Sequence, residues 1–431
     1  MERRLSRRDL LRGLAAASVV AACGAPPDAG GPGAASLLKS EVARATADPK
    51  LAASAASAIQ ALAADLYREL GARPGNLLYS PYSVEIALAM ARAGAAGRTR
   101  DEMDRVLHAP GGAELDAELN ALDQVLARRS GKYPFGDTTV ELELAPANQL
   151  FGQRGFTFEG PFLDRLAASY GAGMRLVDYI GAREQARGEI NAWVAERTHD
   201  RIPKLIPEGV LDARTRLVLT NALYFRGKWA VPFAKGATAA APFHRLDGTT
   251  SQAQLMSLSS TSLGYATGSG YTAVQLPYIG GVSMLVIVPD AGAFAAVESR
   301  LRDGTLAKEV TGGIRRDAAV KLRMPKFTFR SQSLLKPALG ALGMPTAFTD
   351  QADFSGITKA DTLRIQDVVH EAFIAVDEDG TEAAAATAVI FSTTSAPLKQ
   401  IDLVIDRAFF FVIRDDETGT ILFVGRVVDP A

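Results

Sequence analysis

The segment DEDGTEAAAATAVIFSTTSAP, residues 377–397, decides how the rest of the chain is interpreted. Between Gly380 and Pro397 it contains no Gly, Pro, Asn or Asp, which is unusual for a loop of this length. Read with a period of two, one face carries small and then apolar residues from Thr381 to Phe391. The segment therefore predicts a strand that can be added between two strands of an existing sheet.

Alanine leaves a second interpretation open for the first half of this segment. Four consecutive alanines occupy positions 383–386, and alanine has the highest intrinsic helix propensity. The β-branched residues that follow, Thr387, Val389 and Ile390, disfavour a continuing helix because their χ1 freedom is restricted there. A strand-forming segment remains the main expectation.

Composition is that of an ordinary globular protein. The 431 residues are 48% hydrophobic and 22% charged, enough for one large domain or for two or three small ones. The formal net charge of -1 gives no overall electrostatic reason to bind nucleic acid or an anionic membrane surface. Because Cys23 is the only cysteine, no disulfide can form within the chain.

The N-terminus has the pattern of an export signal. A basic start is followed by a short apolar stretch over residues 13–22, too short for a permanent membrane span. SRRDLLR (6–12) resembles a bacterial twin-arginine signal, and VAAC (20–23) resembles the motif before a lipid-modified cysteine. We therefore expect a signal peptide over residues 1–22.

Cys23 is then the predicted lipid attachment site, and residues 23–50 are predicted to form a flexible tether. This arrangement predicts an exported lipoprotein of the cell envelope, facing the periplasm or the exterior and touching the membrane only through its lipid. Cleavage by an ordinary signal peptidase is the alternative, and it would leave a protein secreted to the extracellular space.

Helix signals dominate the section that follows. The spacing of apolar residues predicts a helix over residues 51–70. Ser80 before Pro81 predicts the start of another helix, with Ser80 as its cap. Thr99 and Glu102 have the spacing of a capping box and predict a further helix start.

The remainder mixes strands and helices. Continuous apolar runs at residues 217–225 and 282–288 predict strands that are covered on both faces. Further strands are expected at residues 140–144, 319–329, 363–376, 409–413 and 421–427. Since the chain has neither internal repeats nor regular β–α alternation, an α+β domain with a large sheet is expected.

No pattern of catalytic chemistry is found. The four histidines are far apart in the sequence, and a single cysteine cannot supply a set of thiolate ligands, so no metal site and no cofactor are expected. There is no G-x-S-x-G motif, no P-loop and no complete G-x-G-x-x-G motif. We therefore expect that the protein is not an enzyme.

Six segments over residues 50–431 occur in the order of one known family. They are NLLYSPYSVEIALAMARAGAAGRTRDEM (76–103), LTNALYFRGKW (219–229), MPKFTF (324–329), GMPTAFTDQADFSGI (343–357), VVHEAFIAVDEDGTEAAAATA (368–388) and ILFVGRVVDP (421–430). Together they resemble the serpins, large α+β proteins most of which inhibit serine or cysteine proteases. The resemblance implies one domain over residues 51–431. It also implies a large mixed main sheet, two smaller sheets, about nine helices and an exposed reactive loop near the C-terminus.

The resemblance also assigns roles to particular residues. Those that match the hinge of the reactive loop are Glu378, Gly380, Thr381, Ala383, Ala384, Ala385 and Ala386. Those that match the polar cluster where the main sheet opens are Ser80, Ser83, Asn221 and His370. Trp229 and Lys326 match the top of the sheet, where Lys326 can pair with Glu378. Helix capping by Ser80 and core packing by Trp229 are structural roles that these two residues can have as well.

The function implied is that of a suicide substrate. A target protease attacks a bond of the loop, and the cleaved loop inserts into the main sheet before the acyl-enzyme is hydrolysed. The position of Gly380 places the reactive bond at Thr394–Ser395, which favours an elastase-like or broad-specificity serine protease; Phe391 or Lys399 would suit other proteases. A monomer without a nucleic-acid partner is expected. The alternatives are a non-inhibitory binding or chaperone-like protein of the same fold and a lipid-anchored binding protein of another fold.

Overall fold

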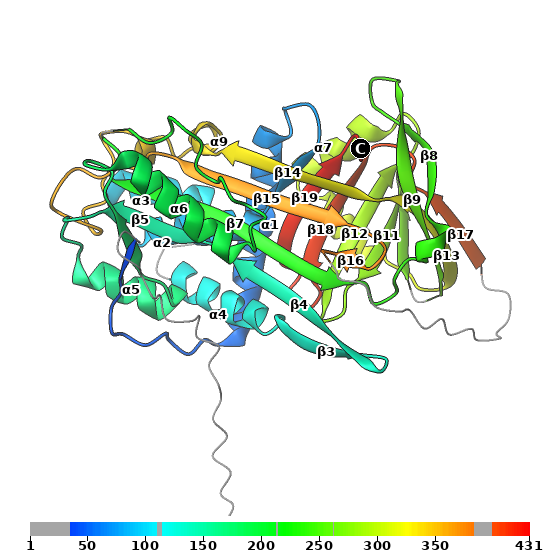
Figure 1. Cartoon of the computed structure of the whole chain (residues 1–431), viewed down its shortest axis with the longest axis horizontal. Coiled ribbons are helices and arrows are strands. Elements are labelled where there is room, and N and C mark those ends of the chain that lie inside the picture. Colours follow the sequence, from blue (N-terminus) through cyan, green and yellow to red (C-terminus); the bar gives the residue numbers. More distant parts are fainter. Residues whose placement is uncertain (1–34, 110–113, 213, 262, 383–398) are drawn as a thin grey trace, which may run out of the picture. The chain divides into compact units, whose positions relative to one another are not determined.

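The computed structural model describes residues 35–109, 114–212, 214–261, 263–382 and 399–431. Within these ranges the chain forms nine α-helices and three sheets, which confirms the expected α+β fold (Figure 1). The helices are α1 (Ala52–Leu70), α2 (Pro81–Arg92), α3 (Gly97–Val106), α4 (Leu115–Ala127), α5 (Gly160–Tyr170), α6 (Arg183–Arg197), α7 (Phe294–Arg302), α8 (Leu306–Gly312) and α9 (Lys336–Leu342). Short 3₁₀ helices are η1 (Pro49–Leu51), η2 (Lys235–Ala237) and η3 (Thr346–Phe348).

The largest sheet has nine strands and both parallel and antiparallel pairs. Its strands are β1 (Ser36–Leu38), β3 (Gly131–Phe135), β4 (Thr138–Pro146), β5 (Gln149–Gln153), β6 (Met174–Val177), β7 (Leu217–Lys228), β14 (Phe327–Leu334), β15 (Val368–Val376) and β16 (Gly380–Thr381). The main path of this sheet runs β1-β6-β5-β7-β16-β15-β14, so β7 and β15 lie in its centre.

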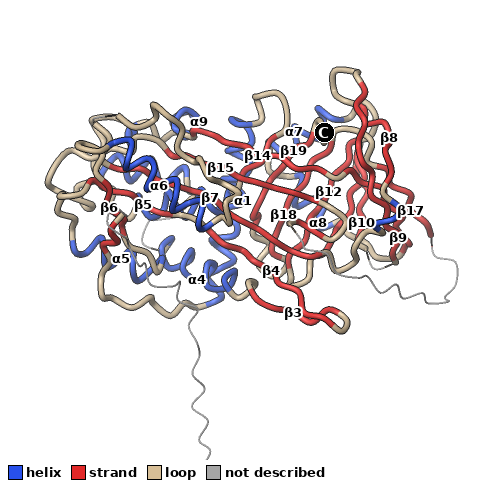
Figure 2. Tube along the Cα trace, viewed as in Figure 1, coloured by secondary structure: helices blue, strands red, loops and turns tan. Residues whose placement is uncertain are grey.

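Two smaller sheets complete the domain. The six-stranded sheet contains β2 (Leu77–Tyr79), β10 (Gly264–Gly268), β11 (Tyr271–Pro277), β12 (Val282–Pro289), β18 (Phe409–Asp415) and β19 (Ile421–Val427). The four-stranded sheet contains β8 (Ala239–His244), β9 (Thr250–Ser260), β13 (Ala318–Pro325) and β17 (Lys399–Val404). Figure 2 shows that this four-stranded sheet lies at one end of the domain, whereas α3, α5 and α6 lie toward the other.

Helices cover both faces of the main sheet. On one face, Ile190 and Val194 of α6 belong to a buried cluster with Val218 of β7 and Val369 of β15. On the other face lies α2, in which all twelve residues are buried. Both central strands are therefore covered on each side, which agrees with the burial of all residues of β7 except the half-buried Arg226.

Several local predictions are confirmed. Helix α1 ends at Leu70, and Ser80 caps α2 by accepting a hydrogen bond from the Ser83 amide at 3.2 Å. The apolar runs at residues 217–225 and 282–288 form the buried strands β7 and β12. These segments have patterns strong enough to define their own structure.

The predicted capping box at Thr99 and Glu102 is wrong, because α3 begins at Gly97 and its cap is Ala96. Both side chains instead bind a segment far along the chain. The Thr99 hydroxyl accepts a hydrogen bond from the Asp353 amide at 2.9 Å, and the Glu102 carboxylate accepts one from the Thr346 amide at 2.9 Å. The side chains that would have formed the capping box are therefore engaged in tertiary hydrogen bonds.

The strand predicted over residues 319–329 is in fact two strands. β13 belongs to the four-stranded sheet and β14 to the main sheet, with Lys326 between them. The strand predicted over residues 363–376 begins only at Val368.

The predicted flexible tether over residues 23–50 is wrong for its second half. β1 forms an antiparallel pair with β6 at the edge of the main sheet, with Leu37 opposite Arg175. Farther on, the Ala45 amide donates to the Ala168 carbonyl of α5 at 2.8 Å. Residues 35–50 therefore belong to the folded unit, whereas the predicted signal peptide and Cys23 lie outside the described residues.

Among the described residues, no helix combines the length and the apolar character needed to cross a membrane.

Candidate functional site: the hinge at the top of the main sheet

The hinge begins inside the main sheet. β7 and β15 are direct parallel neighbours from the pair Leu219–Val368 to the pair Leu223–Ala372. Above this ladder the two strands part, and the two-residue strand β16 lies between them, antiparallel to both. Gly380 lies opposite Lys228 of β7, so the first residues of the loop already occupy a strand position.

Gly380 is required by the close approach of β16 to β7. A Cβ atom at this position would lie 2.1 Å from the Gly227 carbonyl oxygen and 2.9 Å from the Lys228 Cα. Both are backbone atoms of a central strand, so neither can move without disturbing the ladder. A side chain at residue 380 would therefore push β16 away from β7.

Thr381 is buried and held by an aromatic pair. Its hydroxyl forms a hydrogen bond of 2.7 Å with the Tyr278 hydroxyl. The Tyr278 ring stacks on Trp229 with a centroid distance of 4.2 Å, and the Trp229 Nε1 donates to the Asp377 carbonyl at 3.0 Å. Trp229 thus binds the turn before β16, in addition to the core packing expected of it.

Charged side chains hold the same turn from outside. Lys326 lies 2.6 Å from the Glu378 carboxylate, which confirms the expected pair, and the Thr238 hydroxyl donates to Glu378 at 2.6 Å. Burial raises the pKa of Glu378, but the hydrogen bonds from Lys326 and Thr238 outweigh it and lower that pKa below its ordinary value. Lys235 forms a second ion pair of 2.6 Å with Asp379. The turn over residues 377–379 is therefore fixed by the hydrogen bond to its backbone carbonyl and by the ion pairs of Glu378 and Asp379.

Glu382 marks the point where the chain leaves the sheet, and the sequence analysis missed its role. Its backbone is left-handed, with φ of 52°, and its amide donates to the Ala375 carbonyl at 3.0 Å. Its side chain is only 5% exposed and forms an ion pair of 2.5 Å with Arg201. Glu382 lies between Thr381 and Ala383 of the predicted hinge, but nothing in the local sequence indicated its partner Arg201, which follows α6.

The four residues of the predicted sheet-opening cluster lie together in the structure. The Ser80 amide donates to the His370 Nε2 at 3.0 Å, which leaves the proton of this neutral ring on Nδ1. Nδ1 in turn donates to the Asn221 Oδ1 across the β7–β15 ladder. The Ser83 hydroxyl donates to the same Asn221 oxygen at 3.3 Å, so the cluster joins α2 to both central strands.

Asn148 is a further member of the cluster that the sequence did not indicate. Its Oδ1 accepts a hydrogen bond from the Ser83 hydroxyl at 2.6 Å. Asn148 lies between β4 and β5, and its place beside Ser83 follows only from the packing of these strands on β7.

The remaining predicted site residues lie outside the described part of the chain. These are Ala383, Ala384, Ala385, Ala386, the reactive bond Thr394–Ser395 and Cys23. In the described part, no group of three or more His, Cys, Asp and Glu side chains has the arrangement of a metal site.

Comparisons with known proteins agree with this fold. The sequence model described as "Serpin (serine protease inhibitor)" matches residues 57–430. The uncharacterized serpin-like protein TK1782 of Thermococcus kodakarensis is 39% identical over 87% of this chain and 85% of its own. The leukocyte elastase inhibitor of Sus scrofa is 34% identical over 85% of this chain and 97% of its own.

A solved serpin structure has the same fold. Serpin48 of the insect Tenebrio molitor, described as a highly specific serpin, has a TM-score of 0.75 and 32% sequence identity. The match covers 87% of this chain and 97% of that one. The chain belongs to the serpin family.

The His370 ring makes stability depend on pH. Complete burial lowers the pKa of His370 from 6.5 to about 4. Below pH 6.5 the unfolded chain therefore binds a proton that the folded chain does not bind, and stability is lost as the pH falls toward 4. This difference corresponds to about 3 kcal/mol. We expect His370→Gln, which keeps an acceptor and a donor, to flatten the pH dependence of the melting temperature between pH 7 and pH 4.5.

His244 offers the matched control because its side chain is exposed. His244→Gln should leave the pH dependence of the parent unchanged. An equally steep loss of stability in the His370→Gln variant would contradict the assignment of this dependence to His370.

Proposed function

We propose that this protein inhibits a serine protease, or a cysteine protease, by acting as a suicide substrate. The protease attacks a bond of the loop that follows β16 and becomes attached to it as an acyl-enzyme. The cleaved loop then inserts between β7 and β15 and carries the protease with it. The protein itself performs no catalysis in this scheme.

The observation that carries this proposal is the position of β16. Gly380 and Thr381 already form strand pairs with both β7 and β15, so the residues that follow need only extend a strand that has begun. The next residues along the chain include Ala383–Ala386, whose small side chains add little steric conflict to such an extension. Charged, bulky or proline residues at these positions would slow it.

Insertion releases enough free energy to distort an attached protease. About a dozen inserted residues, each with a rise of about 3.3 Å, would move the protease by roughly 40 Å. At about 1 kcal/mol net for each of roughly ten new hydrogen bonds, the driving free energy is on the order of 10 kcal/mol. Before cleavage the fold must therefore be metastable.

The ladder between β7 and β15 is the barrier to insertion of the loop in this scheme. Five residue pairs connect these strands below β16, and the pair of Asn221 with His370 lies in the middle of them. Separating the strands must break the hydrogen bond between these two side chains. The sheet-opening cluster then controls how readily the loop enters.

For the target, we propose an elastase-like or broad-specificity serine protease with cleavage at Thr394–Ser395. Support comes from the small β-branched Thr394 and from a relative named leukocyte elastase inhibitor. We further propose a monomer that is exported as a bacterial lipoprotein with Cys23 as the lipid attachment site. The N-terminal motifs SRRDLLR and VAAC support this location.

Thr381→Arg tests the insertion step. Thr381 is 2% exposed, and burying an arginine beside Tyr278 would cost several kcal/mol. We expect the yield of SDS-stable complex with an elastase-like protease to fall by roughly tenfold or more, with cleaved free inhibitor as the product instead. Thr139→Arg is the matched control, because Thr139 is an exposed residue of β4. If Thr381→Arg formed the complex as efficiently as Thr139→Arg, the insertion mechanism would be excluded.

Cleavage of the loop separates an inhibitor from a non-inhibitory binding or chaperone-like protein of the same fold. Limited proteolysis within residues 383–398 should raise the melting temperature by roughly 10 °C, since about ten hydrogen bonds are gained by insertion. An unchanged melting temperature, measured by calorimetry on the nicked chain, would favour the non-inhibitory alternative.

The reactive bond is tested independently by mass spectrometry of the peptide released from the protease complex. A peptide that begins at Ser395 is expected. A peptide that begins after Phe391 or Lys399 would contradict the assignment to Thr394–Ser395 while leaving the inhibitory mechanism intact.

A further inference from the structure

The N-terminal segment of the folded unit is anchored on two helices far from the hinge. Arg44 donates through Nε to the Asn120 Oδ1 at 2.9 Å and forms an ion pair of 2.5 Å with Asp123, both on α4. The Asn120 amide donates to the Ala45 carbonyl at 2.9 Å, and the Ala45 amide donates to α5. Residues 44–51 therefore form a fixed wall over α4 and α5.

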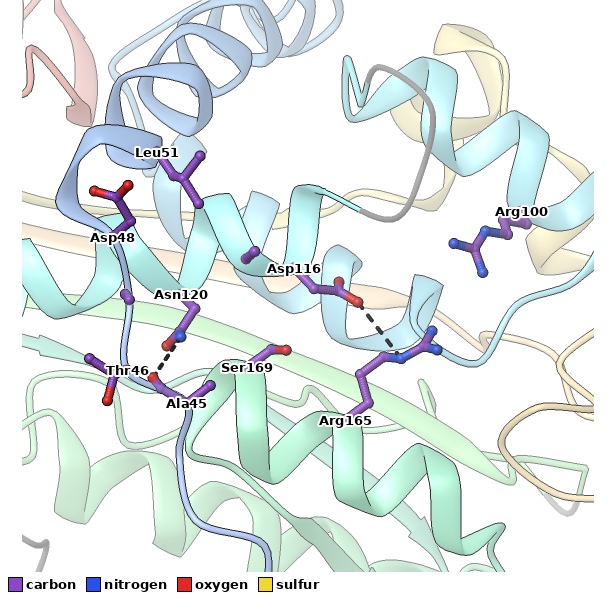
Figure 3. A pocket seen from close by; sticks show the side chains of 11 residues that line it. Ala45, Thr46, Asp48, Leu51, Arg100, Asp116, Asn120, Arg165 and Ser169 are labelled. Atoms are coloured by element: carbon purple, nitrogen blue, oxygen red, sulfur yellow. Dashed lines mark hydrogen bonds and ion pairs between the residues drawn. The ribbon is translucent and has the colours of Figure 1, made fainter.

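A cavity of about 360 Å³ lies between this wall and α3, α4 and α5 (Figure 3). Ala45, Ala47 and Leu51 of the N-terminal segment line it together with Ala117 of α4. These four side chains give the cavity an apolar surface. Its volume suits a small organic molecule rather than a single ion.

Two arginines stand at one end of the same cavity. Arg100 of α3 and Arg165 of α5 line it from different helices, and Figure 3 shows both guanidinium groups reaching the same space beside Asp116. Their side chains are 30% and 44% exposed, respectively, so both can reach a ligand. Guanidinium groups recognise carboxylates through paired hydrogen bonds.

The acids near the arginines already have partners. Asp116 accepts a hydrogen bond of 2.6 Å from the Tyr170 hydroxyl and lies 3.6 Å from Arg92 and 3.9 Å from Arg165. Asp104 pairs with Arg92 and, at 3.8 Å, with Arg100.

Three arginines and two aspartates meet at this end of the cavity. Asp104 and Asp116 pair with the guanidinium groups of Arg92, Arg100 and Arg165. Burial raises the pKa of Glu85, on α2 near Arg92, well above its ordinary value, which favours its uncharged form.

The other end of the cavity contains Asp48, whose carboxylate caps η1 by accepting a hydrogen bond from the Lys50 amide at 3.0 Å. Figure 3 shows Asp48 beside Leu51, on the side away from the two arginines. A bound anion would therefore have its charged group at Arg100 and Arg165 and its apolar part toward Leu51.

We propose that this cavity binds a small amphiphilic carboxylate, with the carboxylate between Arg100 and Arg165 and a short apolar chain against Ala45, Ala47 and Leu51. One wall of the site is the N-terminal segment, so a bound ligand links this segment to α4 and α5. By mass action it stabilises the state in which residues 44–51 cover these helices. The site is separate from the hinge and does not depend on the proposed inhibition.

Calorimetric titration of the full chain with sodium octanoate, at constant ionic strength, tests the site. We expect binding of one octanoate per chain, at least about tenfold tighter than acetate or 1-octanol, because each of these probes lacks one half of the proposed ligand. The double variant R100Q/R165Q should bind octanoate at least about tenfold more weakly than the parent chain.

Two further variants keep the result interpretable if the arginine changes disturb folding. Ala117→Leu retains both arginines and helix propensity but fills the cavity, so it should also weaken octanoate binding. Arg183→Gln, which removes an exposed arginine of α6 outside the cavity, should bind octanoate like the parent. The proposal is overturned if octanoate does not bind, if acetate or 1-octanol binds equally well, or if Ala117→Leu binds octanoate like Arg183→Gln.

Discussion

The short ladder between β7 and β15 is the constraint on which the rest of the structure depends. These two strands are buried on both faces, by α6 on one side and α2 on the other, yet they pair directly over only five residue pairs. Above the ladder, β16 occupies the space between them. A central position of the sheet is thus only partly filled, and below it the ladder begins at the pair Leu223–Ala372. The hydrogen bond between Asn221 and His370 lies in the middle of that ladder.

Contacts at the hinge fix the chain at the point where it enters the space between β7 and β15. Trp229, Tyr278 and the pair of Lys326 with Glu378 hold the turn and the first strand residues in place. Immediately afterwards, the left-handed backbone of Glu382 and its ion pair with Arg201 turn the chain out of the sheet. The uncleaved molecule therefore combines a fixed hinge with a strand position that is only partly filled, and the proposed insertion mechanism requires both features.

The N-terminal segment forms one edge of the main sheet. β1 pairs with β6, and the residues that follow are fixed to α4 and α5 by Arg44 and Ala45. β1 thereby forms this edge of the sheet and pairs with three residues of β6. The cavity between this segment and the helices combines an apolar surface with two accessible arginines, a combination that suits recognition of an amphiphilic anion.

Strong local patterns predicted the buried strands β7 and β12 and the Ser80 cap, because periodicity and burial on both faces are expressed in neighbouring residues. The hinge from Glu378 to Thr381 was implied by the family resemblance. The family resemblance identified the sheet-opening cluster. Local patterns were misleading at Thr99, at Lys326 and over residues 35–50. Only the tertiary structure decided that Thr99 binds Asp353, that β1 pairs with β6, and that Arg201 restrains Glu382. The sequence by itself therefore determined the α+β class and those helices and strands whose local patterns are strongest. Their partners depended on packing between residues far apart in the chain, which no local spacing records.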